Sequence, residues 1–169
     1  IYSCANVGYP TGGEVDKTPP KVLAFIPENE SKNFGSNKVI IQFDEYIQLK
    51  DIDNQVLISP PFEQNPEIQA KGKSLHININ DTFKPNTTYL FQFKNAVVDN
   101  NEGNPLPSVD YVFSTGNFLD SLSIKGSVSD AFTQKPDEGM YVFLYSHFSD
   151  SVVVNSKPVY VTKTDRDGR

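Results

Sequence analysis

Apolar and polar residues alternate most clearly along the stretch 75–93. Residues 75–79 read Leu-His-Ile-Asn-Ile, and residues 89–93 read Tyr-Leu-Phe-Gln-Phe. Successive side chains of a strand point to opposite faces of a sheet, so this period of two gives each segment one apolar face. The intervening residues 81–86 include Asp, Pro and Asn, which favour turns. The pattern predicts two strands, with the aromatic face of the second at the centre of a β core.

Similar short segments lie on both sides of this pair. Residues 38–44 place Val39, Ile41 and Phe43 on one face, and the segment 55–59 ends before two prolines, which cannot continue a ladder. The count is roughly seven strands in about a hundred residues, which is typical of an Ig-like sandwich. The predicted strands are 21–26, 38–44, 55–59, 67–70, 75–80, 89–93 and 110–115, with 96–99 leading into a turn at 100–105.

The strand pattern starts again after Gly116. Residues 140–146 read Met-Tyr-Val-Phe-Leu-Tyr-Ser, which is apolar on both faces and predicts a central buried strand. About fifty residues is near the lower limit for a self-sufficient core. We therefore expect residues 117–169 to form a smaller, incomplete β domain that rests against the first or borrows a strand edge from another molecule. The predicted strands are 121–128, 140–146, 151–154 and 159–164, and a turn is predicted at 165–168.

Composition supports an all-β fold and limits the partners. The chain has 169 residues, and its twenty aromatic residues (8 Tyr and 12 Phe, no Trp) occur with 12 Pro and 10 Gly. These numbers favour a turn-rich β protein over a helical one. The net charge of −6 leaves no basic stripe to neutralise nucleic-acid phosphates or to form a polybasic membrane patch. No apolar run is long enough to span a bilayer.

A single cysteine, Cys4, lies near the N-terminus, so the chain has neither an internal disulfide nor a Cys-based zinc cluster. One interpretation is a buried or incidental thiol, although the polar, Gly-rich residues that follow offer little to bury it. Ile1 and Ser3 fit the lipobox of bacterial lipoproteins, whereas Tyr2 departs from the usual small residue. The resemblance implies that Cys4 carries a lipid anchor, with a membrane as its partner.

The lipobox also has implications for location. It implies a signal peptide, whose apolar region does not fall within this sequence, and an outer-membrane lipoprotein. Residues 1–17 then form the lipoprotein N-terminus and a flexible tether. Residues 5–9 lack the acidic run that similar surface-exposed lipoproteins often carry. The periplasmic face is therefore favoured over the cell surface.

Five short motifs over residues 16–116 resemble, in this order, the bacterial Ig-like domain family of the S-layer-protein type. The resemblance implies an Ig-like β-sandwich over residues 18–116. It also implies a structural role for Tyr89, as in the tyrosine corner of fibronectin-type sandwiches, where the hydroxyl bonds the backbone a few residues upstream. The motifs are Asp16-Lys-Thr-Pro-Pro20, Ile40-Ile-Gln-Phe-Asp-Glu45, Phe83-Lys-Pro-Asn-Thr-Thr-Tyr89, Val98-Asp-Asn-Asn-Glu-Gly-Asn104 and Val112-Phe-Ser-Thr115.

Residues 117–169 are similar to part of a carboxypeptidase-regulatory or transthyretin-like β domain. The similarity implies a second β unit after the sandwich, and the expected division of the chain is 1–17, 18–116 and 117–169. The segments that carry it are Ile124-Lys-Gly-Ser-Val-Ser-Asp-Ala131, Gly139-Met-Tyr-Val-Phe-Leu-Tyr145 and Thr164-Asp-Arg-Asp-Gly168.

Catalytic chemistry finds little support in the sequence. His76 and His147 have no spacing that pairs them with each other or with the cysteine. Asp44 and Glu45 are adjacent on a strand, so their carboxylates point to opposite faces. The chain has no Gly-x-Ser-x-Gly elbow and no phosphate-binding loop. We therefore expect no enzyme and no cofactor.

The polar loop 99–104 is a candidate calcium site. Asp99, Asn101 and Glu102 offer the hard oxygen ligands that calcium prefers, although the loop lacks an EF-hand pattern. Residues 165–168 offer fewer such ligands. The alternative is that both segments are turns, because Asn and Gly tolerate left-handed backbone.

Three functions remain open after these exclusions. The first is a non-catalytic cell-envelope lipoprotein that acts as a binding or spacer module for an unknown protein or glycan. The second is an accessory domain of a larger enzyme or carbohydrate-uptake complex. The third is a glycan-binding module, which would need aromatic side chains on an exposed face.

Overall fold

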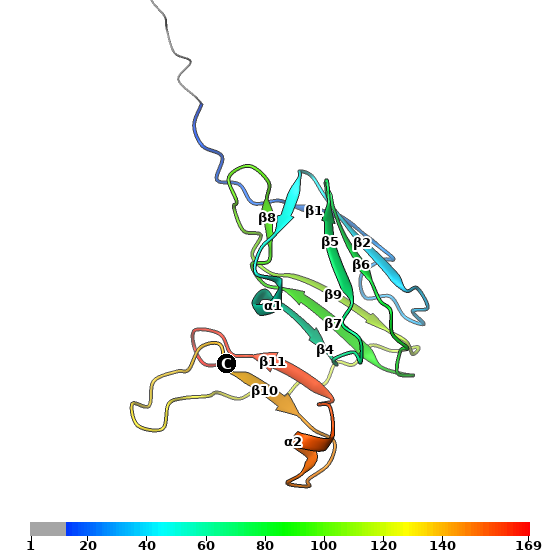
Figure 1. Ribbon diagram of the computed structural model, residues 1–169, viewed down its shortest axis with the longest axis vertical. Coiled ribbons are helices and arrows are strands. Elements are labelled where there is room, and N and C mark those ends of the chain that lie inside the picture. Colours follow the sequence, from blue (N-terminus) through cyan, green and yellow to red (C-terminus); the bar gives the residue numbers. More distant parts are fainter. Residues whose placement is uncertain (1–12) are drawn as a thin grey trace, which may run out of the picture.

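The structure, a computed structural model, describes residues 13–169 and consists almost entirely of strands (Figure 1). The elements are β1 (Val22–Ile26), β2 (Lys38–Phe43), β3 (Ile47–Leu49), α1 (Ile52–Gln55), β4 (Val56–Ser59), β5 (Glu67–Lys71), β6 (Ser74–Asn78), β7 (Thr88–Phe93), β8 (Val97–Asp99), β9 (Val109–Ser114), β10 (Tyr141–Leu144), α2 (Val152–Asn155) and β11 (Tyr160–Lys163).

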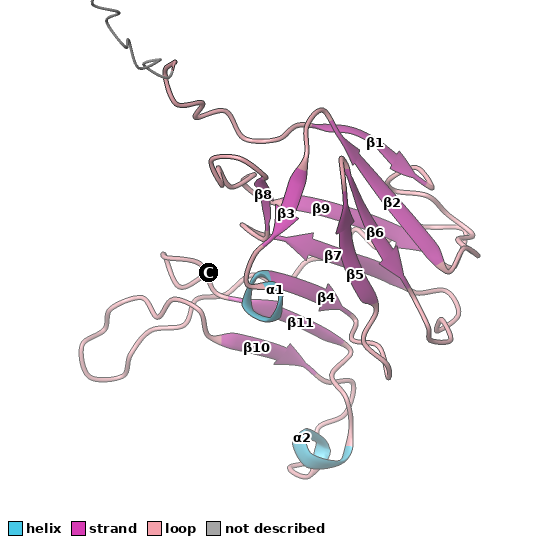
Figure 2. Ribbon diagram, turned by 45° about the horizontal axis from the view of Figure 1, so that its top comes forward, coloured by secondary structure: helices cyan, strands magenta, loops and turns pink. Residues whose placement is uncertain are grey.

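Two antiparallel sheets form a sandwich. One has the strand order β1-β2-β6-β5 and the other has the order β4-β7-β9. β3 and β8 form a separate, short two-stranded sheet at one end (Figure 2). The alternating apolar residues of both sheets point into a common core, which includes Ile41 and Ile77 from the first sheet and Phe91 and Tyr111 from the second. The expected all-β, Ig-like sandwich is confirmed.

Stacked aromatic rings occupy the centre of this core. Phe113 of β9 stacks on Phe34 with ring centroids 3.9 Å apart and on Tyr89 of β7 at 5.3 Å. Tyr89 in turn stacks on Phe62 at 4.8 Å. Phe34 and Phe62 lie in loops, so the rings join loop residues to the central strands. The aromatic face predicted for residues 89–93 is indeed buried, with Phe91 and Phe93 fully enclosed.

Two short elements within 47–55 have no counterpart among the predicted strands. β3 is only three residues long, which is too short for a period of two to register, but it pairs with β8 and buries Ile47. α1 is a single turn that follows Asp51, whose backbone is left-handed (φ 50°). The next strand, β4, begins at Val56 as soon as this turn ends.

The second unit differs from its prediction in three places. Residues 121–128 form no strand, because no neighbouring strand pairs with them. Residues 152–155 form α2, one helical turn, instead of a strand. Residues 140–146 were expected to be central and buried, but β10 is an edge strand whose only strand partner in the described chain is β11, and Phe143 is 50% exposed.

The stability of the fold should therefore depend on the sandwich core and not on the second unit. Replacing Phe113, which has no exposed surface, with alanine should lower the free energy of unfolding by about 3–5 kcal/mol through lost burial and a cavity. The matched control, Phe132→Ala, removes a side chain that is 95% exposed and should change it by less than about 0.5 kcal/mol. Urea unfolding measures both, and equal effects would contradict this assignment of the core.

Candidate functional site

The carboxylate of Asp99 lies inside its own loop. Its Oδ1 accepts hydrogen bonds from the backbone N–H groups of Asn101, Glu102 and Gly103 at 2.7–3.0 Å, and its Oδ2 accepts one from Asn104 at 2.9 Å. The residue is only 2% exposed. Gly103 has φ 78°, a left-handed conformation that glycine adopts without strain.

These contacts set the charge state of Asp99. Burial acts to raise the pKa of the carboxyl, but the N–H donors, Gly103 first, outweigh it and hold the pKa at about 2, below the usual 3.8. Both oxygens are therefore occupied by backbone donors. Asn101 and Glu102, the other two candidate calcium ligands, are exposed, whereas Asp99 is buried. The geometry is that of a turn organised by a buried carboxylate.

The loop also fixes the entry of the chain into the sandwich. The side-chain amide of Asn104 donates to the backbone oxygen of Asp16 at 3.0 Å. Asp16 in turn accepts from the backbone N–H of Thr18 at 2.9 Å, and this bond is the main cause of its lowered pKa. Asp99 thus holds a loop that in turn holds the start of the described chain.

The other residues singled out in the sequence are dispersed. The hydroxyl of Tyr89 accepts a hydrogen bond from the backbone N–H of Lys84 at 3.0 Å, which is the contact expected of a tyrosine corner. Asp44 accepts from the backbone N–H of Lys21 at 2.8 Å. His76 lies half-buried on β6, and burial lowers its pKa, whereas His147 lies in the second unit. Cys4 lies outside the described residues.

No group of three or more His, Cys, Asp or Glu side chains that could hold a metal ion occurs within residues 13–169. The polar side chains described above, Asp16, Asp44, Tyr89 and Asp99, instead hydrogen-bond to backbone N–H groups of nearby turns and strands.

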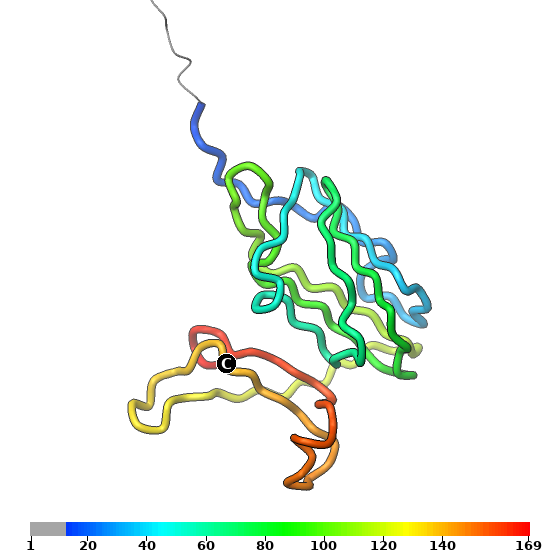
Figure 3. Tube along the Cα trace, viewed as in Figure 1, coloured from blue at the N-terminus to red at the C-terminus, as the bar shows by residue number. Residues whose placement is uncertain are grey.

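The second unit rests on the edge of the sandwich formed by β4. The chain leaves β9, passes through a long excursion and returns with β11 beside β4 (Figure 3). We call this contact the seam. Its hydrogen bonds are Val161 N–H to Ser59 Oγ (3.1 Å), Asp120 N–H to Thr88 Oγ1 (2.9 Å) and Lys94 Nζ to the Lys163 carbonyl (3.5 Å). Within the second unit, the Tyr160 hydroxyl donates to Asp120 Oδ2 at 3.2 Å.

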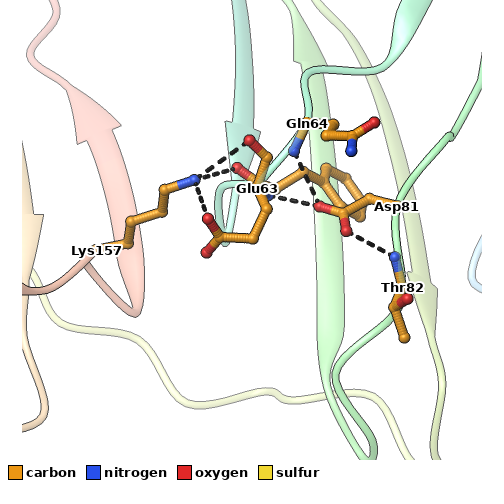
Figure 4. A network of polar contacts seen from close by, with 6 residues as sticks. Glu63, Gln64, Asp81, Thr82 and Lys157 are labelled. Carbon is orange, nitrogen blue, oxygen red and sulfur yellow. Dashed lines mark hydrogen bonds and ion pairs between the residues drawn. The ribbon is translucent and has the colours of Figure 1, made fainter.

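Lys157 holds one end of the seam. Its ammonium group donates to the carbonyl oxygens of Phe62 (3.0 Å) and Glu63 (3.4 Å) and pairs with the Glu63 carboxylate at 2.8 Å (Figure 4). Asp81 braces the same loop from the other side by accepting hydrogen bonds from the backbone N–H groups of Glu63 and Gln64. The Gln64 bond is the main cause of the lowered pKa of Asp81.

Sequence reasoning missed Lys157, Ser59 and Asp81 as contact residues. Each lies in a polar loop or at the end of a strand and belongs to no motif. Their partners are about a hundred residues away in two cases, since Val161 reaches Ser59 across 102 positions and Lys157 reaches Phe62 across 95. No local pattern encodes such a contact.

β11, which forms the seam, pairs with the outer strand β10 in a two-stranded sheet that we call the ribbon. Tyr141 and Phe143 lie on one face, with their ring planes 14° apart and centroids 6.1 Å apart, and Val142 and Leu144 lie on the other. Lys163 lies over the Tyr141 ring, 5.0 Å from its centroid. No apolar side chain is buried within residues 117–169. The second unit thus exposes apolar side chains and encloses none.

The Asp99 geometry leads to a pH-dependent prediction. Asp99→Asn should lower the midpoint of thermal unfolding at neutral pH, because an amide accepts fewer of the loop's N–H bonds. The folded pKa lies below the usual value of 3.8. The wild-type advantage is therefore present above that value and is lost as pH falls from about 4 to about 2. Asp53→Asn, which alters an exposed acid in α1, should leave the midpoint unchanged; a wild-type advantage that persists at pH 2 would contradict this account.

The seam leads to a local prediction. Lys157→Ala should speed amide hydrogen exchange in 160–163 while leaving the exchange of β7 unchanged. The free energy of unfolding should fall by less than about 1 kcal/mol, because exposed ion pairs contribute little. Lys125→Ala, an exposed lysine of the same unit, is the matched control and should alter neither. Unchanged exchange in Lys157→Ala would show that this contact does not hold the seam.

Comparison with known proteins gives one clear result. The family model described as bacterial Ig-like domain matches residues 16–115. No curated protein matches the chain. Within the described residues, no helix has the length and apolar character needed to cross a membrane.

Two solved structures are similar at low identity. PcoC, a methionine-rich copper resistance protein from Escherichia coli, is 17% identical, with 57% of this chain and 98% of that chain covered and a TM-score of 0.41. The N-terminal part of the bacterial S-layer protein SbsC is 15% identical, with 90% of this chain and 32% of that chain covered and a TM-score of 0.36. The family match covers more than half of the sequence, and the chain belongs to the bacterial Ig-like domain family.

Proposed function

We propose that this protein is a non-catalytic module of the bacterial cell envelope, anchored through a lipidated Cys4, in which the sandwich acts as a spacer and the ribbon as a binding surface. The observation that carries the proposal is the position of the ribbon. Figure 1 shows the N-terminal segment leaving the sandwich at the end opposite the ribbon. An anchor at the first end would hold the apolar ribbon away from the membrane.

The Ig-like family membership fits the spacer role, because a sandwich is a scaffold and any functional site is carried on it separately. The apolar side chains of the ribbon support the binding role, because the four residues 141–144 are each 42–50% exposed and no core of the second unit encloses them. The resemblance of residues 117–169 to part of a carboxypeptidase-regulatory or transthyretin-like domain supports a second β unit. The lipobox favours the outer membrane, facing the periplasm.

A glycan-binding role is the second candidate, and one observation favours it. Tyr141 and Phe143 present two nearly parallel rings on an exposed face, the arrangement that a sugar ring stacks on. A glycan array that gives a signal with the wild type and none with Phe143→Ala would favour this role. An accessory role in a larger enzyme or uptake complex would place the same ribbon against another domain.

The anchor is tested by metabolic labelling with an alkyne fatty acid in cells that express the gene with its natural upstream sequence. We expect the wild type to take up the label and to fractionate with membranes, because two or three acyl chains hold a protein stably. Cys4→Ala should lose both properties, while Val15→Ala, which alters the same tether outside the lipobox, should keep them. Equal labelling of wild type and Cys4→Ala would rule out the anchor.

A further inference from the structure

The ribbon has a free strand edge that lacks the usual protection against pairing. β10 pairs with β11 on one side, and in the described chain no strand lies on its other side. Edge strands normally carry charges or prolines that prevent association. β5 has Glu67 and Lys71 at its ends, and β1 is followed by Pro27, but residues 139–146 contain neither a charge nor a proline.

The exposed side chains of β10 match one another. Residues 140–144 read Met-Tyr-Val-Phe-Leu, so aromatic residues occupy one face and aliphatic residues the other. When two copies of β10 pair antiparallel about a twofold axis perpendicular to the sheet, the aromatic faces of both strands lie on one side of the sheet and the aliphatic faces lie on the other. Aromatic residues then lie opposite aromatic residues, and aliphatic residues lie opposite aliphatic ones.

We propose that the free edge of β10 pairs with β10 of a second copy of this chain. In the register in which Val142 lies opposite the same residue of the second copy, Tyr141 lies opposite Phe143 and Met140 opposite Leu144. This register leaves each of residues 140–144 opposite an apolar residue of the same stretch. A shift by one pair in either direction sets Met140 opposite Ser146, or Leu144 opposite Glu138.

Charge explains why the second copy meets the chain at this edge. The net charge of −6 makes two copies repel each other over most of their surfaces. The uncharged residues 139–146 let the two backbones approach without like charges opposite each other. The product is a four-stranded sheet in the order β11-β10-β10-β11. Because the paired segment is short, we expect a weak dimer that depends on concentration.

The inference rests on the proposed role of the ribbon as a binding surface, but not on the lipid anchor. Every variant is therefore made in the full chain with Cys4→Ala, which removes both acylation and intermolecular disulfides. Sedimentation equilibrium over a range of concentrations should show reversible dimers of this parent chain. A monomer at all concentrations would overturn self-pairing, whatever the labelling of Cys4 shows.

A charge placed at the twofold axis tests the register. Val142→Lys sets two ammonium groups opposite each other and should raise the dissociation constant of the dimer about tenfold or more. Thr162→Lys is the matched control, because Thr162 is exposed and pairs with Val142 on the same face but lies in β11, away from the free edge. It should leave the dissociation constant nearly unchanged. Equal losses in both variants would indicate face-to-face association and overturn the proposal.

Charge complementation provides the decisive experiment. Val142→Asp alone should also weaken the dimer, and an equimolar mixture of the Val142→Lys and Val142→Asp chains should restore it as a heterodimer. Circular dichroism confirms that each variant retains the β spectrum of the parent. A mixture that stays monomeric would show that position 142 does not face its own copy. In cells, a photocrosslinker at position 143 should give an adduct of twice the chain mass, and adducts of other masses alone would assign the ribbon to a different partner.

Discussion

The aromatic stack around Phe113 is the interaction on which the rest of the structure depends. Phe113 stacks on Tyr89, and Tyr89 stacks on Phe62, which lies in the loop that follows β4. The next residue in that loop, Glu63, binds Lys157 of the second unit through its carbonyl and its carboxylate. The core therefore fixes the loop, and the loop fixes one end of the seam. The position of the ribbon follows from packing in the sandwich more than from any core of its own.

Local patterns were sufficient to predict most of the sandwich. The period of two in β2, β6, β7 and β9 is a property of neighbouring residues, and it decides which side chains face the core before any tertiary contact is known. Tyr89 was likewise identified by the residues just before it. Phe34 and Phe62 were not predicted as core members, because they lie in polar loops and are buried only by strands distant in sequence.

The second unit shows where such patterns stop being informative. A strand that is apolar on both faces needs other elements packed against each face. The sequence pattern does not tell whether the described chain supplies those elements. β10 has that composition and remains half exposed. The three valines at 152–154 have high strand propensity, but with no strand beside them they form a single helical turn. Asp99 is a similar case, because the composition of its loop fits both a cation site and a turn. The turn becomes evident only from the four backbone N–H groups that point at the Asp99 carboxylate.

The way the sandwich edge is covered explains why β10 is left as an outer strand. β4 is an edge strand of its sheet, and β11 covers it through side-chain contacts such as Val161 N–H to Ser59 Oγ instead of a continuous ladder. Covering β4 in this way leaves β10 as the outer strand, which carries no charge to discourage pairing. The unprotected edge thus lies at the end of the molecule opposite the N-terminal segment. A partner that binds by main-chain pairing meets its backbone donors and acceptors there.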